Sequence, residues 1–430
     1  MITYRFDRWD WIFAIGFALA AAVAVMATSH LVGLVRDEGF YMRAAEVTAD
    51  YIQFSLDSMS RGDFSAPFSA NTIKRHFEFN SEHPTFVKNL FGLSLFIFHR
   101  KLQIFSFVNS IRLVAALFAA ATAFLLYLFG RLFFSRASAL AAPPLFFTMP
   151  HIFFHSHLAC FDVPILFFWT AVFVLYAWYL ITRNRWLAFG VAVLFGLGMA
   201  TKHNVYFIPP LFLLIWLVTH FTQYHYLEQR YRGFLGFFRA VPLPLYLMPL
   251  VSLPLFFASW PWLWHDTVKR LRDYLAFHAY HVNYTNYYFG EELSVAPFPF
   301  SYPWVMTFFT TPLPQLVCFF AALALFGWWI FSPRSGPLRR HIGILFLVGA
   351  LFPIFLIALP SVPIFGGIKH FFTGQPILLA AGVAVVLEGV RTCACFFPCV
   401  KRDMFQFVLV VAVSYTHLRA HETPEHLVCR

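Results

Sequence analysis

A few acids at the ends of long hydrophobic runs are the residues in this sequence whose types could do chemistry. Asp37 and Glu38 follow directly after the first run, and Asp162 stands at the start of another. Asp162 is also the only acid between Glu82 and Glu228. A carboxylate at the mouth of a membrane span costs free energy unless it is solvated, paired or used. These acids are therefore candidates for a general base.

Three lysines fall in polar segments that the hydrophobic pattern places on the same membrane face. They are Lys88, Lys202 and Lys369. Amines beside a carboxylate suit the transfer of a sugar from a lipid-linked phosphate. The departing phosphate is already stabilised as an anion, so cations that neutralise the departing charge can replace a general acid. A carboxylate takes the proton of the acceptor hydroxyl, and we predict Asp37 as this base and Lys88 as the phosphate contact.

The elements that must position these residues are hydrophobic runs long enough to cross a bilayer. Of the 430 residues, 60% are hydrophobic and 12% are charged, and the mean hydropathy is +0.67, which argues against a soluble enzyme. Backbone groups in lipid must be satisfied within their own segment, so the spans are helices. We predict an all-α polytopic membrane protein with about ten to eleven transmembrane helices. The predicted spans cover residues 11–34, 105–129, 139–154, 163–181, 186–200, 206–218, 241–259, 305–331, 342–359 and 371–387, and an eleventh begins at 405–413.

The polar loop between the first two spans, residues 36–101, holds eight of the 20 acids of the chain. Phe40, Ala44 and Val47 recur there at helical spacing, which predicts an amphipathic interfacial helix opened by the acid pair. Pro84 at a first helical position predicts a second interfacial helix. The alternative for each acid is a helix-capping role, and for each lysine an interfacial side chain that snorkels.

The net charge of +11 is explained by membrane topology and does not require a nucleic-acid partner. Arg5 and Arg8 precede the first span and place the N-terminus in the cytoplasm by the positive-inside rule. The acids and lysines then face the opposite side. The compact sequence, with no soluble domain, favours a bacterial inner membrane protein whose active site faces the periplasm.

Four motifs of this chain resemble the motif series of the GT-C membrane glycosyltransferases. They are Asp37-Glu38 with Tyr41, Glu82-His83-Pro84 with Lys88, Asp162-Val163-Pro164, and Gly198-Met199-Ala200-Thr201-Lys202. Within that class the sequence is most similar to glycosyltransferase family 39, the protein O-mannosyltransferases and lipid A aminoarabinose transferases. Thr85 stands where the family pattern has a second proline after His83-Pro84.

The resemblance implies a GT-C-like fold and an inverting transferase that takes a sugar from a polyprenyl-phosphate donor. It implies catalytic roles for Asp37 and Glu38. The partners it implies are the lipid donor, the bilayer, and an acceptor that is a protein, a lipid or a glycan. The implied donor-phosphate contacts are Lys88, Lys202 and Lys369, and the supporting residues are Tyr41, His83, Asp162 and His370.

Two other readings of the residues stay open in the sequence. Many spans with a few polar residues also suit a membrane transporter that uses the same charged groups. A divalent metal is the alternative to a site without a cofactor, because His residues at i and i+4 share a helix face. Its ligands would be His151, His155 and His157 together with Asp162.

The C-terminal end of the sequence departs from the pattern of the rest. We expect residues 1–412 to form one GT-C-like transmembrane domain. Residues 413–430 turn polar and resemble a translated sequencing adapter, so we expect the natural protein to continue beyond about Ala412.

Overall fold

The structure, a computed structural model, describes residues 6–222, 234–279 and 283–396. The first part contains α1 (Arg8–Thr28), α2 (Arg36–Ser60), α3 (Ala70–Phe77), α4 (Phe86–Ser94), α5 (Phe107–Phe133), α6 (Arg136–Phe147), α7 (Pro150–His157), α8 (Asp162–Thr182), α9 (Arg185–Met199) and α10 (Ile208–Phe221). The later parts contain α11 (Phe234–Ala240), α12 (Leu243–Ser259), α13 (Thr267–Ala279), α14 (Tyr302–Thr310), α15 (Leu313–Phe331), α16 (Pro337–Ala358) and α17 (Gln375–Phe396). A hairpin of β1 (Asn286–Tyr288) and β2 (Glu291–Leu293) pairs Asn286 with Leu293.

The described residues contain seven helices that are long and apolar enough to cross a membrane. The bent pair α6 and α7 is long and apolar enough for an eighth span when its two helices are taken together, and α9 and α12 are shorter apolar helices. Together these correspond one to one with the predicted spans up to residue 387. The prediction of an all-α polytopic membrane protein is therefore confirmed, whereas the predicted start of an eleventh span at 405–413 and the tail at 413–430 lie outside the described residues.

The prediction of one continuous span over residues 139–154 is wrong. The chain bends by 71° between α6 and α7. The cause is Pro150, the first residue of α7, because a proline disfavours the helical region for the residue before it. Met149 accordingly lies in the extended region, with ψ of 119°.

A second proline interrupts the predicted span over residues 305–331. Thr311 ends α14 in an extended conformation, with ψ of 125°. Pro312 follows and caps α15. Like Pro150, it disfavours the helical region for the residue before it, which here is Thr311. The membrane span is α15, and α14 is a separate short helix.

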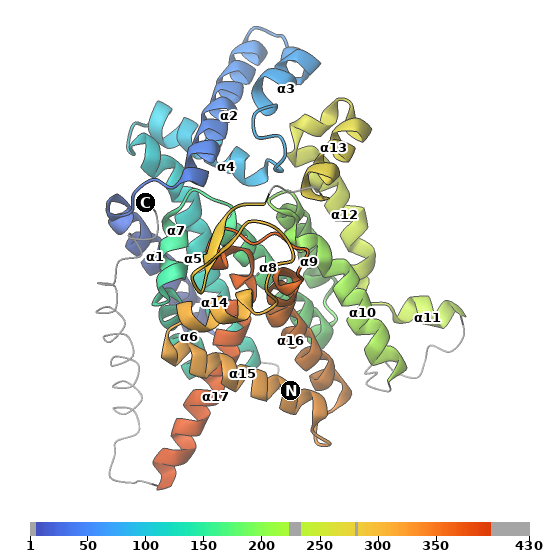
Figure 1. The fold of residues 1–430 in the computed structure, drawn as a ribbon. Coiled ribbons are helices and arrows are strands. Elements are labelled where there is room, and N and C mark those ends of the chain that lie inside the picture. The colour runs from blue at the N-terminus through green and yellow to red at the C-terminus, as the bar shows by residue number, and fades with distance from the viewer. Residues whose placement is uncertain (1–5, 223–233, 280–282, 397–430) are drawn as a thin grey trace.

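Several helices that are not membrane spans lie together at one end of the molecule. Figure 1 shows α2, α3, α4 and α13 together at that end, above the bundle formed by the longer helices. The predicted helix after the first span is α2, and Asp37 and Glu38 lie in its first turn. The second predicted helix, α4, begins at Phe86 and not at Pro84, and the Phe86 N–H bonds to the carbonyl of Ala200.

The two largest buried cores join most of these elements. The larger core is built from α5 to α10, α12 and α14 to α17. The smaller core joins the outer helices α2 and α4 to α5, and it includes Ala45, Val87, Phe91 and Ile111. The start of α2 is therefore fixed relative to the membrane spans by packing along its own length.

A buried ion pair fixes the connection between α1 and α2. Arg112 of α5 donates to both carboxylate oxygens of Glu38, at 2.9 and 2.8 Å. The same guanidinium donates to the backbone carbonyls of Ser29, Val32 and Gly33, which belong to the connecting segment. One arginine thus holds both the turn that leaves the first span and the helix that follows it.

We predict that Glu38→Gln destabilises the protein by about 3–5 kcal/mol, because it leaves the buried Arg112 charge without its counter-ion. The measurement is thermal or denaturant unfolding in detergent. Glu46→Gln is the matched control on the same helix, since its ion pair with Arg43 is exposed and should be worth less than about 1 kcal/mol. Equal effects of the two substitutions would contradict the role given to Arg112.

Candidate active site

Four segments that are distant in the sequence meet at the end of the molecule where α2 and α4 lie. They are the first turn of α2, the first turn of α8, the turn after α9, and a short 3₁₀ helix at Gly367–His370. Each brings one charged residue, in this order: Asp37, Asp162, Lys202 and Lys369. The two acids and two lysines form two ion pairs.

The first pair joins Asp37 to Lys369, with 2.6 Å between Oδ2 and Nζ. The Asp37 side chain is 41% exposed, so a substrate can reach it, whereas that of Lys369 is only 15% exposed. Burial alone would lower the pKa of Lys369, but the carboxylates of Asp162 and Asp37 raise it above its usual value. Lys369 therefore stays an ammonium at neutral pH, placed between two carboxylates.

The second pair is internal. Lys202 Nζ lies 3.1 Å from Asp162 Oδ1, and both side chains are largely buried. His155 of α7 lies 3.7 Å from the other oxygen of Asp162. Since Lys369 also interacts electrostatically with Asp162, the two pairs form one alternating cluster of charge.

The structure separates the two acids for which the sequence predicts one catalytic role. Glu38 is 0% exposed. Besides its two bonds from Arg112, it accepts the backbone N–H of Ala159 at 2.9 Å and that of Val35 at 3.2 Å. With every face of the carboxylate occupied, Glu38 has no side open to a substrate, and Asp37 is the accessible member.

Lys88, the predicted phosphate contact, directs its amine into its own loop. Nζ donates to the backbone carbonyls of Asn80 and His83, at 2.6 and 2.8 Å. Burial lowers the pKa of Lys88 to about 7. In this structure the lysine therefore holds the loop before α4 in place.

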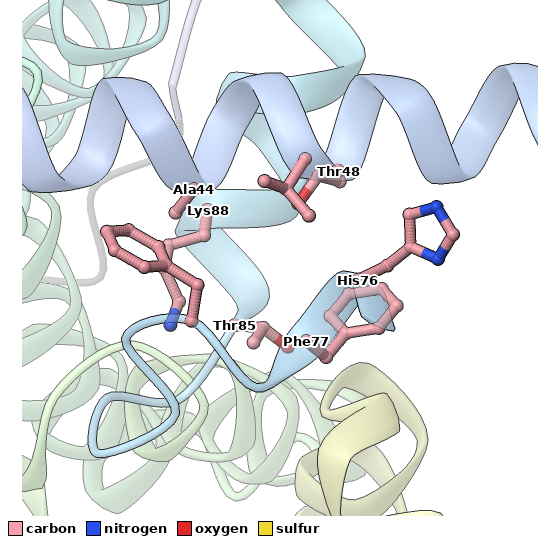
Figure 2. Close-up of a pocket in the computed structure, with 8 residues that line it drawn as sticks. Ala44, Thr48, His76, Phe77, Thr85 and Lys88 are labelled. Carbon is pink, nitrogen blue, oxygen red and sulfur yellow. The ribbon is translucent and has the colours of Figure 1, made fainter. Parts of the chain in front are cut away.

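A small hollow lies beside Lys88, between α2 and the segment that leads into α4. Figure 2 shows Ala44 and Thr48 of α2 on one side and His76 and Phe77 of α3 on the other. None of the four clustered charges lines it. It is therefore separate from the charge cluster, and its lining consists of Ala44, Val47, Thr48, His76, Phe77, Phe79, Thr85 and Lys88.

The predicted supporting residues Tyr41, His83 and His370 lie around the cluster. The Tyr41 ring is 6.2 Å from the His83 ring, and burial raises the pKa of Tyr41 well above its usual value. Burial, together with the charge of Lys88, lowers the pKa of His83. Burial and the charges of Lys202 and Lys369 likewise lower the pKa of His370. All three side chains are uncharged at neutral pH and add no net charge to the site.

The alternative metal site is not assembled by the residues that the structure describes. His151 Nε2 bonds to Gln375 Oε1 at 2.8 Å. His157 Nε2 bonds to Thr28 Oγ1 at 2.7 Å, towards α1. His155 alone approaches Asp162, so the spacing of three histidines does not bring them to one point.

Arg112 is the site-forming residue that the sequence analysis missed. It lies inside the predicted span 105–129, where a charged side chain is costly unless it is paired. That cost was the available signal, because pairing with an acid is one way to stabilise an arginine within a span. Which acid it meets depends on the packing of α5 against the start of α2.

Comparisons with known proteins identify the class of this fold. Residues 83–241 match the family model described as dolichyl-phosphate-mannose-protein mannosyltransferase. The structure is similar to ArnT from Cupriavidus metallidurans bound to undecaprenyl phosphate, with 14% identity, a TM-score of 0.55, and coverage of 96% of this chain and 70% of that one. It is also similar to the oligosaccharyltransferase AglB from Archaeoglobus fulgidus in complex with an inhibitory peptide and a dolichol-phosphate, with 12% identity, a TM-score of 0.56, and coverage of 96% and 56%.

These likenesses, together with the helical architecture, show that the chain has the GT-C glycosyltransferase fold. No curated protein sequence matches it. The resemblance drawn from the motifs is therefore confirmed at the level of the fold.

We predict a pH-dependent contribution of Lys88 to stability. Its pKa in the folded protein, about 7, lies below the ordinary value of 10.5. The unfolded chain therefore binds more protons between these two values, and the free energy of unfolding rises with pH across that range. The advantage of the parent over Lys88→Met should grow from pH 7 upwards by at most about 1.4 kcal/mol per pH unit.

Thermal unfolding in detergent between pH 6 and pH 9.5 measures this difference. Lys74→Met is the control, since Lys74 is an exposed residue of α3 and its variant should differ from the parent by a constant amount. A Lys88→Met difference that is also constant with pH would contradict the prediction.

Proposed function

We propose that this protein transfers a sugar, with inversion, from a polyprenyl-phosphate donor to an acceptor hydroxyl. The observation that carries the proposal is the exposed Asp37 carboxylate held 2.6 Å from Lys369. A base and a cation then stand together at one end of a bundle of membrane helices. The likeness to ArnT with undecaprenyl phosphate and to AglB with dolichol-phosphate supports a lipid-linked donor.

In the reaction, the acceptor oxygen attacks the anomeric carbon and forms the new glycosidic bond. The bond between that carbon and the phosphate oxygen breaks, and its electron pair stays on the polyprenyl phosphate. Asp37 takes the proton of the acceptor hydroxyl. The attack comes from the face opposite the leaving phosphate, so the configuration at the anomeric carbon inverts.

Lys369 changes partner during this step. Before transfer it neutralises Asp37, and this pairing weakens the carboxylate as a base. The phosphate of the donor carries one negative charge and gains a second as the bond breaks, so its attraction for the ammonium grows towards the transition state. A contact that strengthens in the transition state raises kcat, and withdrawal of the ammonium frees Asp37 to accept the proton.

The other predicted site residues act by position. Glu38, held by Arg112, fixes the first turn of α2 and so aims Asp37. Asp162 and Lys202 supply a buried charge pair beside Lys369 that keeps the ammonium in place. Lys88 holds the loop that carries His83, which packs against Tyr41.

No step of the proposed reaction uses a metal ion. Asp37 and Asp162 are each within ion-pair distance of a lysine, so a divalent cation bound to both carboxylates would compete with these two amines for their charge. The transporter alternative has no specific support. The charged residues of the cluster lie in the first turns of helices and in the segments between them, away from the middle of any described span.

The acceptor is proposed to be a protein, a lipid or a glycan. The proposed setting is the bacterial inner membrane, with the charge cluster facing the periplasm. This orientation follows the positive-inside bias, since Arg5 and Arg8 precede the first span.

We predict that Asp37→Asn lowers kcat by about 10²–10⁴-fold, because the amide cannot take the acceptor proton. The assay follows a radiolabelled sugar from a polyprenyl-phosphate donor into the membrane fraction. Asp57→Asn, an exposed acid near the end of the same helix, should keep the parent rate. Equal turnover by Asp37→Asn and the parent would remove Asp37 as the base.

Lys369→Met should lower kcat by about 10²–10³-fold, as expected when a cation that stabilises the transition state is lost. Steady-state kinetics with varied donor concentration separate kcat from KM. Lys269→Met, which removes an exposed lysine of α13, serves as the control. An increase in KM with an unchanged kcat would assign Lys369 to ground-state binding only.

A further inference from the structure

The donor phosphate needs a cation in the ground state, before Lys369 has exchanged partners. The three lysines predicted for this role are already engaged in the structure. Lys88 bonds to loop carbonyls, Lys202 is paired with Asp162, and Lys369 is paired with Asp37. Binding of an anion by any of them first requires the loss of an existing contact.

We propose that Arg36 binds the phosphate of the polyprenyl-phosphate donor, an assignment that rests on the proposed function. Arg36 is the first residue of α2, directly before Asp37, and it is exposed. Within the described ranges no carboxylate lies within ion-pair distance of it. Arg43, further along the same helix, is by contrast paired with Glu46 at 3.2 Å.

The Arg36 side chain lies against the Tyr284 ring, which in turn contacts the Phe365 ring. Its guanidinium carbon lies 5.7 Å from the centre of the Tyr284 ring, a cation–π distance. The Tyr284 ring is 5.3 Å from that of Phe365. A guanidinium placed over a ring keeps its N–H groups available at its edge, and this planar fork matches two oxygens of a phosphate.

The same rings connect Arg36 to the segment that carries Lys369. The Phe365 ring is 4.3 Å from the ring of His370, the next residue after Lys369. The Asn286 side chain, at the start of β1, donates to the backbone carbonyl of Ile364, which ties the hairpin to the segment of Lys369. These ring contacts therefore link Arg36, the residue before Asp37, to the segment that carries Lys369, the partner of Asp37.

This arrangement divides the binding of the phosphate between two cations. Among the residues that the structure describes, Arg36 has no acid partner to leave, so its charge is available to the single negative charge of the intact donor. Lys369 becomes available as the second charge develops. Arg36 thus sets the affinity for the donor and for the polyprenyl-phosphate product, whereas Lys369 sets the rate of transfer.

The test measures binding of undecaprenyl phosphate to the full chain in nanodiscs, alongside donor KM and kcat. Arg36→Gln should weaken undecaprenyl-phosphate binding and raise the donor KM by about tenfold or more, which is the usual effect of losing a charge-assisted hydrogen bond. The kcat of this variant should change less than about threefold, because Lys369 still stabilises the transition state. Arg36→Lys should recover only part of the affinity, because an ammonium does not form the bidentate contact. Arg43→Gln is the matched control on α2 and should bind as the parent does.

The outcomes separate this inference from the proposed function. Parent-like binding and KM in Arg36→Gln, with transfer still lost in Asp37→Asn, would overturn the role of Arg36 and leave the transferase intact. A parent protein that binds no polyprenyl phosphate and transfers no sugar would overturn both. A fall in kcat alone would also contradict the assignment. Thermal unfolding of Arg36→Gln checks its fold, and Tyr284→Phe, which keeps the ring, should retain the parent affinity.

Discussion

The buried ion pair between Glu38 and Arg112 is the interaction on which the position of the site depends. Taking two charges out of water is costly, and the cost is recovered only when the geometry is good and the remaining donors and acceptors are satisfied. Here the carboxylate accepts four hydrogen bonds, two from Arg112 and two from backbone N–H groups. Arg112 in turn holds three carbonyls of the chain that leaves α1. The first turn of α2 is therefore held in one orientation, in which Asp37 meets Lys369 while part of its side chain stays exposed.

Three carboxylates near the site differ in burial, and this difference gives them different roles. Glu38 is fully buried and saturated, so it serves structure, whereas Asp37 is 41% exposed and makes one ion pair, so it can exchange partners. Asp162 lies between these extremes, buried but bound to Lys202. Each acid is accompanied by one cation, and the cluster is close to neutral. A neutral cluster can receive an anionic donor without the large repulsion that an excess of carboxylates would cause.

Much of the fold could be predicted because hydropathy and helix length are properties of local sequence. The breaks were not predicted at Pro150 and Pro312, although the reason is equally local, since a proline excludes the preceding residue from the helical region. The site was predicted less fully. The sequence indicated which residues are chemically unusual, but it grouped Glu38 with Asp37 and assigned Lys88 to the phosphate, while Arg112 inside a hydrophobic span was passed over.

The sequence by itself determined that this chain is a bundle of membrane helices with acids and amines near their ends, because apolar length and charge placement can be read one segment at a time. Only the tertiary structure decided which charge meets which. Asp37 and Lys369 are 332 positions apart, and Glu38 and Arg112 are separated by 74. Adjacent residues on a helix point in different directions, so Asp37 and Glu38 have different partners. The partner of each depends on which distant helix packs against that side, and no local pattern contains this information.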